Sequence, residues 1–152
     1  MSTAYSSAIS AYRKATTAVP PLSAVVLLYD EVLNSVVHAA CHVRDKEFEQ
    51  AHVRTQKAVT ILKGLRQNLD MEAGGEVSEQ LLDTYSKNIL ALNTTIGKKD
   101  AVERYKSIAA GLLELRNAWS KMTPFSERDA DMLFIDIDGT REDTPATAGS
   151  AV

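Results

Sequence analysis

Four stretches of this chain repeat apolar residues every three or four positions, the spacing that places them on one face of a helix. They cover residues 21–43, 46–69, 76–96 and 100–122. The first stretch carries two apolar stripes, so its apolar arc is wider than one neighbouring groove requires. Its second stripe comprises Val25, Leu28, Val32 and Ala39. The pattern predicts four long helices, the first of which has surplus apolar surface.

The connections between these helices are short, and short connections force long helices to lie antiparallel to their neighbours. The pair Gly74-Gly75 predicts a tight reversal between the second and third helices, because glycine can end a helix in the left-handed conformation at little cost. We therefore expect an all-α fold, an antiparallel up-down four-helix bundle with a short N-terminal helical cap and a partly disordered C-terminal tail.

Sequence composition changes at both ends of this bundle. Pro20-Pro21 breaks a marginal helix in residues 1–20, which we expect to form the cap. Residues 1–122 carry 15 Lys and Arg against 13 Asp and Glu, whereas residues 123–152 carry 2 against 7. We expect three units, the cap at 1–20, the bundle at 21–122 and an acidic, mostly disordered tail at 123–152. The apolar tail segment 132–137 leaves two alternatives open, docking on the bundle or disorder in a solubilising tail.

Composition and motifs exclude several partners and compartments. The 152 residues are 45% hydrophobic and 24% charged, which is ordinary for one globular domain. We find no basic patch for nucleic acid, and no apolar run that approaches the ~18 residues of a membrane span. The single cysteine, Cys41, suits a reducing compartment, and the N-terminus does not resemble a secretory signal. We expect a cytoplasmic protein without nucleic-acid or membrane partners.

Two groups of polar residues could carry chemistry. His38 and His42 lie near the end of the first helix, and Glu49 and His52 near the start of the second, where a hairpin could gather them around a metal ion or small ligand. Solvent-facing histidines are the simpler interpretation, because di-iron bundles need two Glu-x-x-His motifs. Residues 136–140 match the Asp-x-Asp-Gly-Thr motif of a phosphatase class, but without the parallel sheet that this chemistry needs. We expect no catalytic residue, metal or cofactor.

Three tyrosines fall on the apolar stripes, namely Tyr29, Tyr85 and Tyr105. Packing in the core with the hydroxyls at the rim is the simpler interpretation, and contact with a partner is the other. Tyr12 lies outside the bundle, on the marginal N-terminal helix. Docking of that helix over an apolar groove would explain both Tyr12 and the second stripe of the first long helix.

Several short strings occur together in an order that is typical of one family. They are Ala11-Tyr12, Pro21 followed by Leu27-Leu28-Tyr29-Asp30, the turn Glu72-Ala73-Gly74-Gly75-Glu76, Leu82 with Tyr85, and Leu115-Arg116-Asn117-Ala118-Trp119. Over residues 11–122 the chain resembles FliS, the flagellin-specific secretion chaperones of bacteria. Residues 123–152 lie outside the resemblance.

This resemblance implies a cytoplasmic chaperone, not an enzyme, that binds the C-terminal segment of flagellin one to one. It would prevent premature polymerisation of flagellin and support export through the flagellar type III secretion system, with other flagellar export or regulatory proteins as further candidate partners. A hydrophobic groove would shield the apolar face of the flagellin helix. The expected contact residues are Ile9 and Tyr12 on a movable cap, Tyr29, Ile61, Leu65, Leu82, Tyr85 and Ile89. The alternative is a metal- or small-ligand-binding bundle that uses the histidine group.

Overall fold

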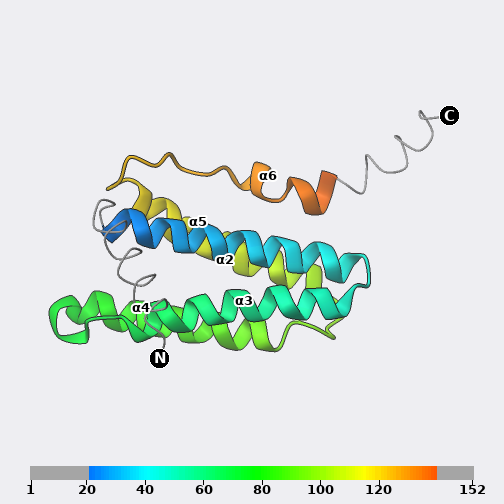
Figure 1. Ribbon diagram of the computed structural model, residues 1–152, viewed down its shortest axis with the longest axis horizontal. Helices are drawn as coiled ribbons and strands as arrows, with labels where there is room; N and C mark the ends of the chain where they lie inside the picture. Colours follow the sequence, from blue (N-terminus) through cyan, green and yellow to red (C-terminus); the bar gives the residue numbers. More distant parts are fainter. Residues whose placement is uncertain (1–20, 140–152) are drawn as a thin grey trace, which may run out of the picture.

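The computed structural model describes residues 21–139, and every regular element within that range is a helix (Figure 1). The elements are α2 (Pro21–Arg44), α3 (Phe48–Gln67), α4 (Met71–Asn93), α5 (Ala101–Ser120), the short α6 (Ala130–Leu133) and a further helical stretch at 135–139. The all-α fold expected from the apolar spacing is confirmed. The expected cap, residues 1–20, lies outside the described residues.

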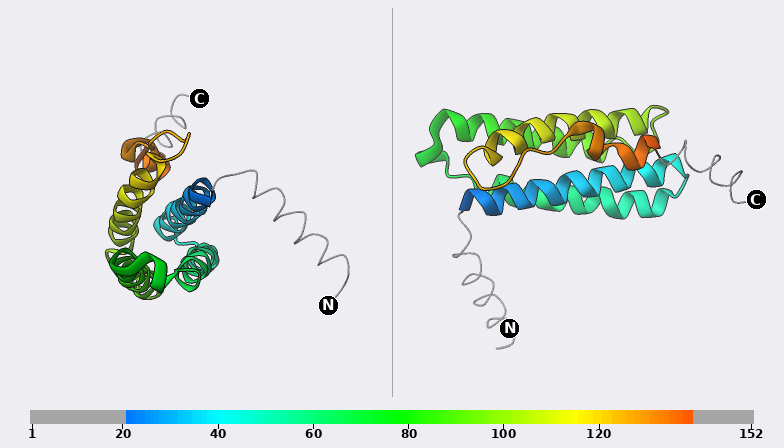
Figure 2. Two further views of the ribbon diagram at one scale, coloured as in Figure 1. Left: turned by 90° about the vertical axis from the view of Figure 1, so that its left-hand side faces the viewer. Right: turned by 90° about the horizontal axis from the view of Figure 1, so that it is seen from above.

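The four long helices form an up-down bundle in which chain neighbours run antiparallel (Figures 1 and 2). Helix α2 packs against both α3 and α5, and α3 packs against α4. Among the four neighbouring pairs of long helices, α4 and α5 pack least closely. In the end-on view of Figure 2, α2 and α4 lie at diagonal corners. The α2–α5 pair therefore closes the bundle between the first and the last of these helices.

The reversal between α3 and α4 includes Gly75, as the sequence predicts, but it begins earlier, at residues 68–70, and contains one helical turn before the glycine pair. Asp70 caps α4, since its carboxylate accepts hydrogen bonds from the backbone N–H groups of Glu72 and Ala73 at 3.1 and 2.9 Å. The glycine pair instead breaks α4 after its first turn, where Gly75 has φ 52° and ψ −125°. The strong cap moves the helix start upstream, and the glycines supply a kink.

Each glycine of this pair has a separate structural role. Gly75 occupies a backbone region that residues with a side chain rarely adopt. A Cβ at Gly74 would lie 1.8 Å from the hydroxyl oxygen of Ser78. That hydroxyl donates to the carbonyl oxygen of Asp70 at 2.8 Å and so fastens the first turn to the rest of α4. The two residues together fix the path of the chain into α4.

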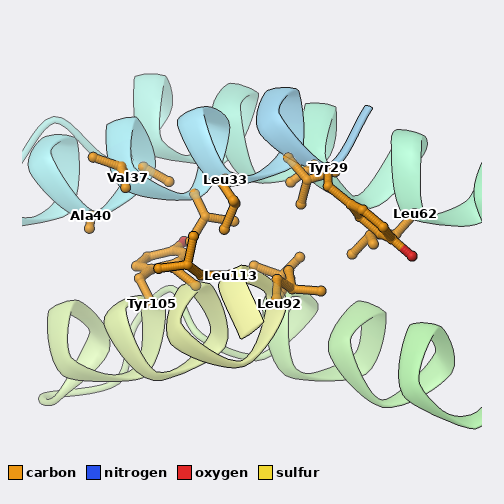
Figure 3. Packing of buried hydrophobic residues seen from close by; sticks show 14 of the residues in the cluster. Tyr29, Leu33, Val37, Ala40, Leu62, Leu92, Tyr105 and Leu113 are labelled. Atoms are coloured by element: carbon orange, nitrogen blue, oxygen red, sulfur yellow. The ribbon is translucent and has the colours of Figure 1, made fainter. Parts of the chain in front are cut away.

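The core runs the length of the bundle and draws large side chains from all four long helices (Figure 3). Its largest fully buried members include Tyr29, Leu33, Leu62, Leu92 and Tyr105. These residues lie on the apolar stripes that predict the helices. The stripes therefore predict most of the buried face of each long helix, although Leu28, on the second stripe of α2, is 39% exposed.

The hydroxyls of the core tyrosines lie inside the bundle rather than at its rim. The Tyr29 and Tyr85 hydroxyls hydrogen-bond to each other across the diagonal between α2 and α4. The Tyr105 hydroxyl pairs with Thr55 Oγ1 at 2.7 Å, and Thr55 also donates to the Ala51 carbonyl oxygen. These hydroxyl oxygens can be buried at little cost because each one has a hydrogen-bond partner. The sequence indicated the buried face but could not indicate these pairings.

The expectation that no apolar run approaches the length of a membrane span was wrong for α2. Among the described residues α2 is the one helix long and apolar enough, over Leu22–Arg44, to cross a membrane by length and composition alone. Asp30 and Glu31 interrupt the apolar run of α2 but lower its mean hydropathy only slightly. A search for uninterrupted apolar runs therefore misses this helix. Half of the most apolar window is buried inside the bundle, as in any core helix, so this property is weak evidence for a membrane.

After α5 the chain turns back and runs along the bundle beside α2 and α5 (Figures 1 and 2). Residues 121–129 have no regular structure, and the helical residues of 130–139 follow. We call residues 126–139 the tail segment. Its Leu133 and Ile137 belong to the core cluster, so the docked alternative describes this part of the tail. Residues 140–152 lie outside the described range.

Candidate partner-binding surface

The eight residues predicted to bind a partner fall into three groups. Ile9 and Tyr12 lie outside the described residues. The core buries Tyr29, Tyr85 and Ile89. Closer to the surface are Ile61, Leu65 and Leu82, of which the first two are half-buried and the last is 38% exposed.

Tyr29 and Tyr85 form a buried unit that joins α2 to α4. Their ring centroids lie 6.3 Å apart with the planes tilted by 45°. Burial raises the pKa of both phenols, so both stay neutral and can share a hydrogen bond. Because both rings are buried between α2 and α4, a partner cannot contact them unless these helices separate.

The three outer residues, two on α3 and one on α4, lie on either side of α3. Ile61 is one turn beyond Lys57, whose ammonium lies 3.6 Å from the Glu31 carboxylate of α2, so Ile61 lies along the α2 edge. Leu82 is one turn before Ser86, which accepts a hydrogen bond from Arg66 of α3. The structure thus brings Ile61 and Leu65 to one edge of α3 and Leu82 to the other.

Exposed apolar side chains are more frequent in the half of the bundle where α2 and α4 begin and α5 ends. Of the eleven large apolar residues exposed within 21–139, six lie in this half: Leu27, Leu28, Met71, Val77, Leu82 and Met122. We call this set the apolar end. These residues lie on α2, on α4 and just after α5, and exposed apolar side chains of this size are candidates for contact with a partner. Its Leu28 belongs to the second stripe of the first helix, a sequence signal that the predicted contact set did not use.

Two buried polar atoms at the same end lack partners within the described part of the chain. They are the Ser23 hydroxyl, in the first turn of α2, and the Trp119 indole N–H, in the last turn of α5. A buried donor left unsatisfied costs about 1–3 kcal/mol. The apolar end is therefore a place where an added segment of chain could supply both apolar contact and hydrogen-bond acceptors.

A second surface lies along α2 and α5, where the tail segment is anchored by arginines. Asp30 of α2 pairs with Arg116 of α5 at 2.9 Å and with Arg128 of the tail segment at 2.8 Å. Arg116 also donates to the Ser126 carbonyl oxygen at 2.6 Å. Asn117 exchanges two hydrogen bonds with the backbone of Arg128, both 2.9 Å long. Because the Arg116 side chain is almost fully buried, these contacts are little screened by solvent.

Further along, the tail segment inserts apolar residues between α2 and α5. Leu133 and Ile137 are buried, and the Phe134 ring lies 5.4 Å from the ammonium of Lys106. The same ammonium contacts both carboxylate oxygens of Asp138 at 3.0 and 3.1 Å. Arg44 donates to the carbonyl oxygens of Asp136 and Ile137 at the end of the segment.

The residues considered for chemistry are not assembled into a site. No group of three or more His, Cys, Asp or Glu that could hold a metal ion occurs among residues 21–139. His42 pairs with Glu47 at 2.9 Å, while His38, Glu49 and His52 are exposed on the helix surface. Asp136 and Asp138 lie in a helical stretch and contact α2 or α5 rather than ending a strand. The phosphatase-like string therefore lacks the setting of its chemistry.

Comparison with known proteins places this architecture in one family. The model of the family described as flagellar protein FliS matches residues 3–125, most of the chain. A flagellar secretion chaperone FliS of Campylobacter jejuni is 28% identical over 104 residues, which cover 67% of this chain and 79% of that protein. The FliS chaperone of Escherichia coli is 29% identical over 98 residues, 64% of this chain and 71% of that protein. No solved structure matches the chain. The chain belongs to the FliS family, which is a family of flagellar secretion chaperones and not of enzymes.

Proposed function

We propose that this chain binds the C-terminal segment of flagellin one to one in the cytoplasm and holds it, unpolymerised, for export by the flagellar type III system. Family membership supports a chaperone role in flagellar export. The apolar end supports binding of an apolar helical segment there. The observation that carries the proposal is the concentration of exposed apolar side chains where α2 and α4 begin.

The physical reason for such a chaperone lies in its client. A segment that becomes a helix only inside a filament exposes an apolar face while it waits, and a groove on a rigid bundle can cover that face. Ordering the segment on binding costs free energy, so the contact has to bury a large apolar area. The apolar end offers side chains from α2, α4 and the end of α5 for this contact. We propose Ile61, Leu65 and Leu82 as contacts, with Tyr29, Tyr85 and Ile89 supporting them from the core.

Residues 1–20 complete the proposal as a movable cap. They join α2 at the apolar end, and Ile9 and Tyr12 supply the apolar residues of the cap. A helix this short is marginal on its own in water, so it can leave at modest cost when flagellin arrives. The proposed sequence of events is cap release followed by docking of the flagellin helix.

Isothermal titration calorimetry tests the proposal. The full chain is titrated with full-length flagellin and with flagellin that lacks its C-terminal segment. We expect one-to-one binding of the first with a free energy of about −8 kcal/mol or stronger, and no measurable binding of the second. Equal affinity for the two flagellins would refute the proposed site on the partner.

A further inference from the structure

The tail segment packs against the bundle of its own chain in the way that a separate helical ligand would. It lies outside the FliS family match, which ends at residue 125, yet it is packed into the core cluster. Its apolar side chains divide between a buried and an exposed face, as in an amphipathic helix. Leu133 is 6% exposed and Ile137 is 2% exposed, whereas Met132 is 65% exposed and Ile135 is 51% exposed. This is the helix-in-groove mode of recognition, within one chain.

The groove that receives it is formed by one face of α2 and one face of α5. On α2 the face includes Cys41 and Arg44, one turn apart, and on α5 it includes Val102 and Lys106. Ile137 and Asp138 share a small cavity with Arg44 and Val102. Basic groups of the bundle therefore border an apolar floor, and the acidic tail segment complements them in charge.

In the half of the bundle where α2 begins and α5 ends, the Asp30 pairs with Arg116 and Arg128 hold the tail segment to both helices. A partner helix seated at the apolar end and extending along α2 and α5 would meet the tail segment.

We infer that the tail segment is an intramolecular competitor that closes the α2–α5 groove, and that the flagellin helix displaces it. This inference rests on the proposed function and adds that the tail segment regulates the access of flagellin to the groove. A tethered ligand competes at an effective concentration of about millimolar, so a weak contact is enough to hold the groove closed. The apparent association constant for flagellin equals the intrinsic constant multiplied by the fraction of chains whose groove is open.

Two substitutions in the full chain separate the docked face of the tail segment from its free face. Ile137→Asp places a charge in the buried contact and releases the segment, whereas Ile135→Asp adds the same charge at an exposed position two residues away. Asp138→Lys is a second releasing variant, because it sets like charges opposite Lys106 at an exposed site and leaves the bundle core untouched. Circular dichroism confirms that each variant keeps its helices.

Cys41, the one cysteine of the chain, reports on release. Burial raises the pKa of its thiol, and the carboxylates of Asp136 and Asp138 raise it further. Cys41 is only partly buried, and departure of the tail segment exposes its thiol further and favours the reactive thiolate. We expect a thiol reagent to label Ile137→Asp about tenfold faster than Ile135→Asp, if about 90% of the wild-type chains are closed. Asp138→Lys changes the rate in the same direction by less.

Calorimetry with flagellin then tests competition. We expect Ile137→Asp to bind about tenfold more tightly than wild type or Ile135→Asp. Salt raises the affinity of the wild type toward that of Ile137→Asp, because it weakens the ion pairs of the tail segment. Equal labelling of the two isoleucine variants would show that the groove is not closed in solution. Faster labelling with unchanged affinity would overturn competition while the proposed function stands. If no form of the chain binds flagellin, the proposed function fails and the inference fails with it.

Discussion

Substitution of Gly75 by alanine should destabilise the bundle through the backbone alone. With φ 52° and ψ −125°, this position lies in a region that alanine occupies only under strain, although no atom lies within 4 Å of where its Cβ would be. Such strain costs about 1–3 kcal/mol. Gly74→Ala should cost at least as much for a different reason, because the new Cβ would displace the Ser78 hydroxyl from the Asp70 carbonyl.

Gly111→Ala is the matched control. Gly111 lies on the exposed surface of α5 in helical conformation, with open space around a Cβ, so alanine there should stabilise the chain by about 0.5–1 kcal/mol. Urea unfolding followed by far-UV circular dichroism measures all three variants. With a slope of about 1–3 kcal/mol per molar urea, Gly75→Ala should lower the midpoint by roughly 1 M and Gly111→Ala should raise it. If Gly75→Ala and Gly111→Ala shift the midpoint in the same direction, the broken path of α4 is wrong.

Three further predictions concern the partner surface, the N-terminal segment and the buried tyrosines. Leu82→Asp should weaken flagellin binding in calorimetry at least about tenfold, by the loss of apolar contact, while Leu90→Asp, on the same helix and 66% exposed, should not. Deletion of residues 1–17 should leave the circular dichroism of the bundle intact and change flagellin affinity, and unfolding of that variant would contradict a cap role. Burial raises the pKa of each core tyrosine, so above pH 10 the unfolded chain loses protons that the folded chain keeps. The free energy of unfolding measured in urea should therefore fall above pH 10, by up to about 1.4 kcal/mol per pH unit for each tyrosine, and a flat profile would refute this.

The helices were predictable because each depends on a local repeat. Val26, Leu33 and Leu62 lie on stripes that any amphipathic helix must bury, so their positions in the core follow from spacing alone. The start of α4 was placed too late because Gly74-Gly75 and the Asp70 cap compete as boundary signals over a few residues. Only the hydrogen bonds of the Asp70 side chain decide between them.

The candidate surface was less predictable, because it depends on which helix edges meet. The stripes place Tyr29 and Tyr85 on buried faces, but their shared hydrogen bond requires the diagonal arrangement of α2 and α4. Ile61 and Leu82 both lie off the main stripes, and sequence spacing cannot tell that Ile61 lies on the α2 side of α3 whereas Leu82, on α4, lies on its other side. The docking of Ile137 likewise depends on partners such as Arg44, which are remote in the chain.

The pairing of α2 with α5 has a consequence for how the chain folds as it is made. Helices α2, α3 and α4 are successive in the chain and can form local hairpins, but α2 has to wait for α5 before its second face is covered. Contacts between distant segments form later than local ones. Until Tyr105 and Leu112 arrive, the nascent chain exposes the apolar side of α2, and such intermediates aggregate readily. Synthesis of the chaperone thus passes through a stage in which it has the same liability as the client proposed for it.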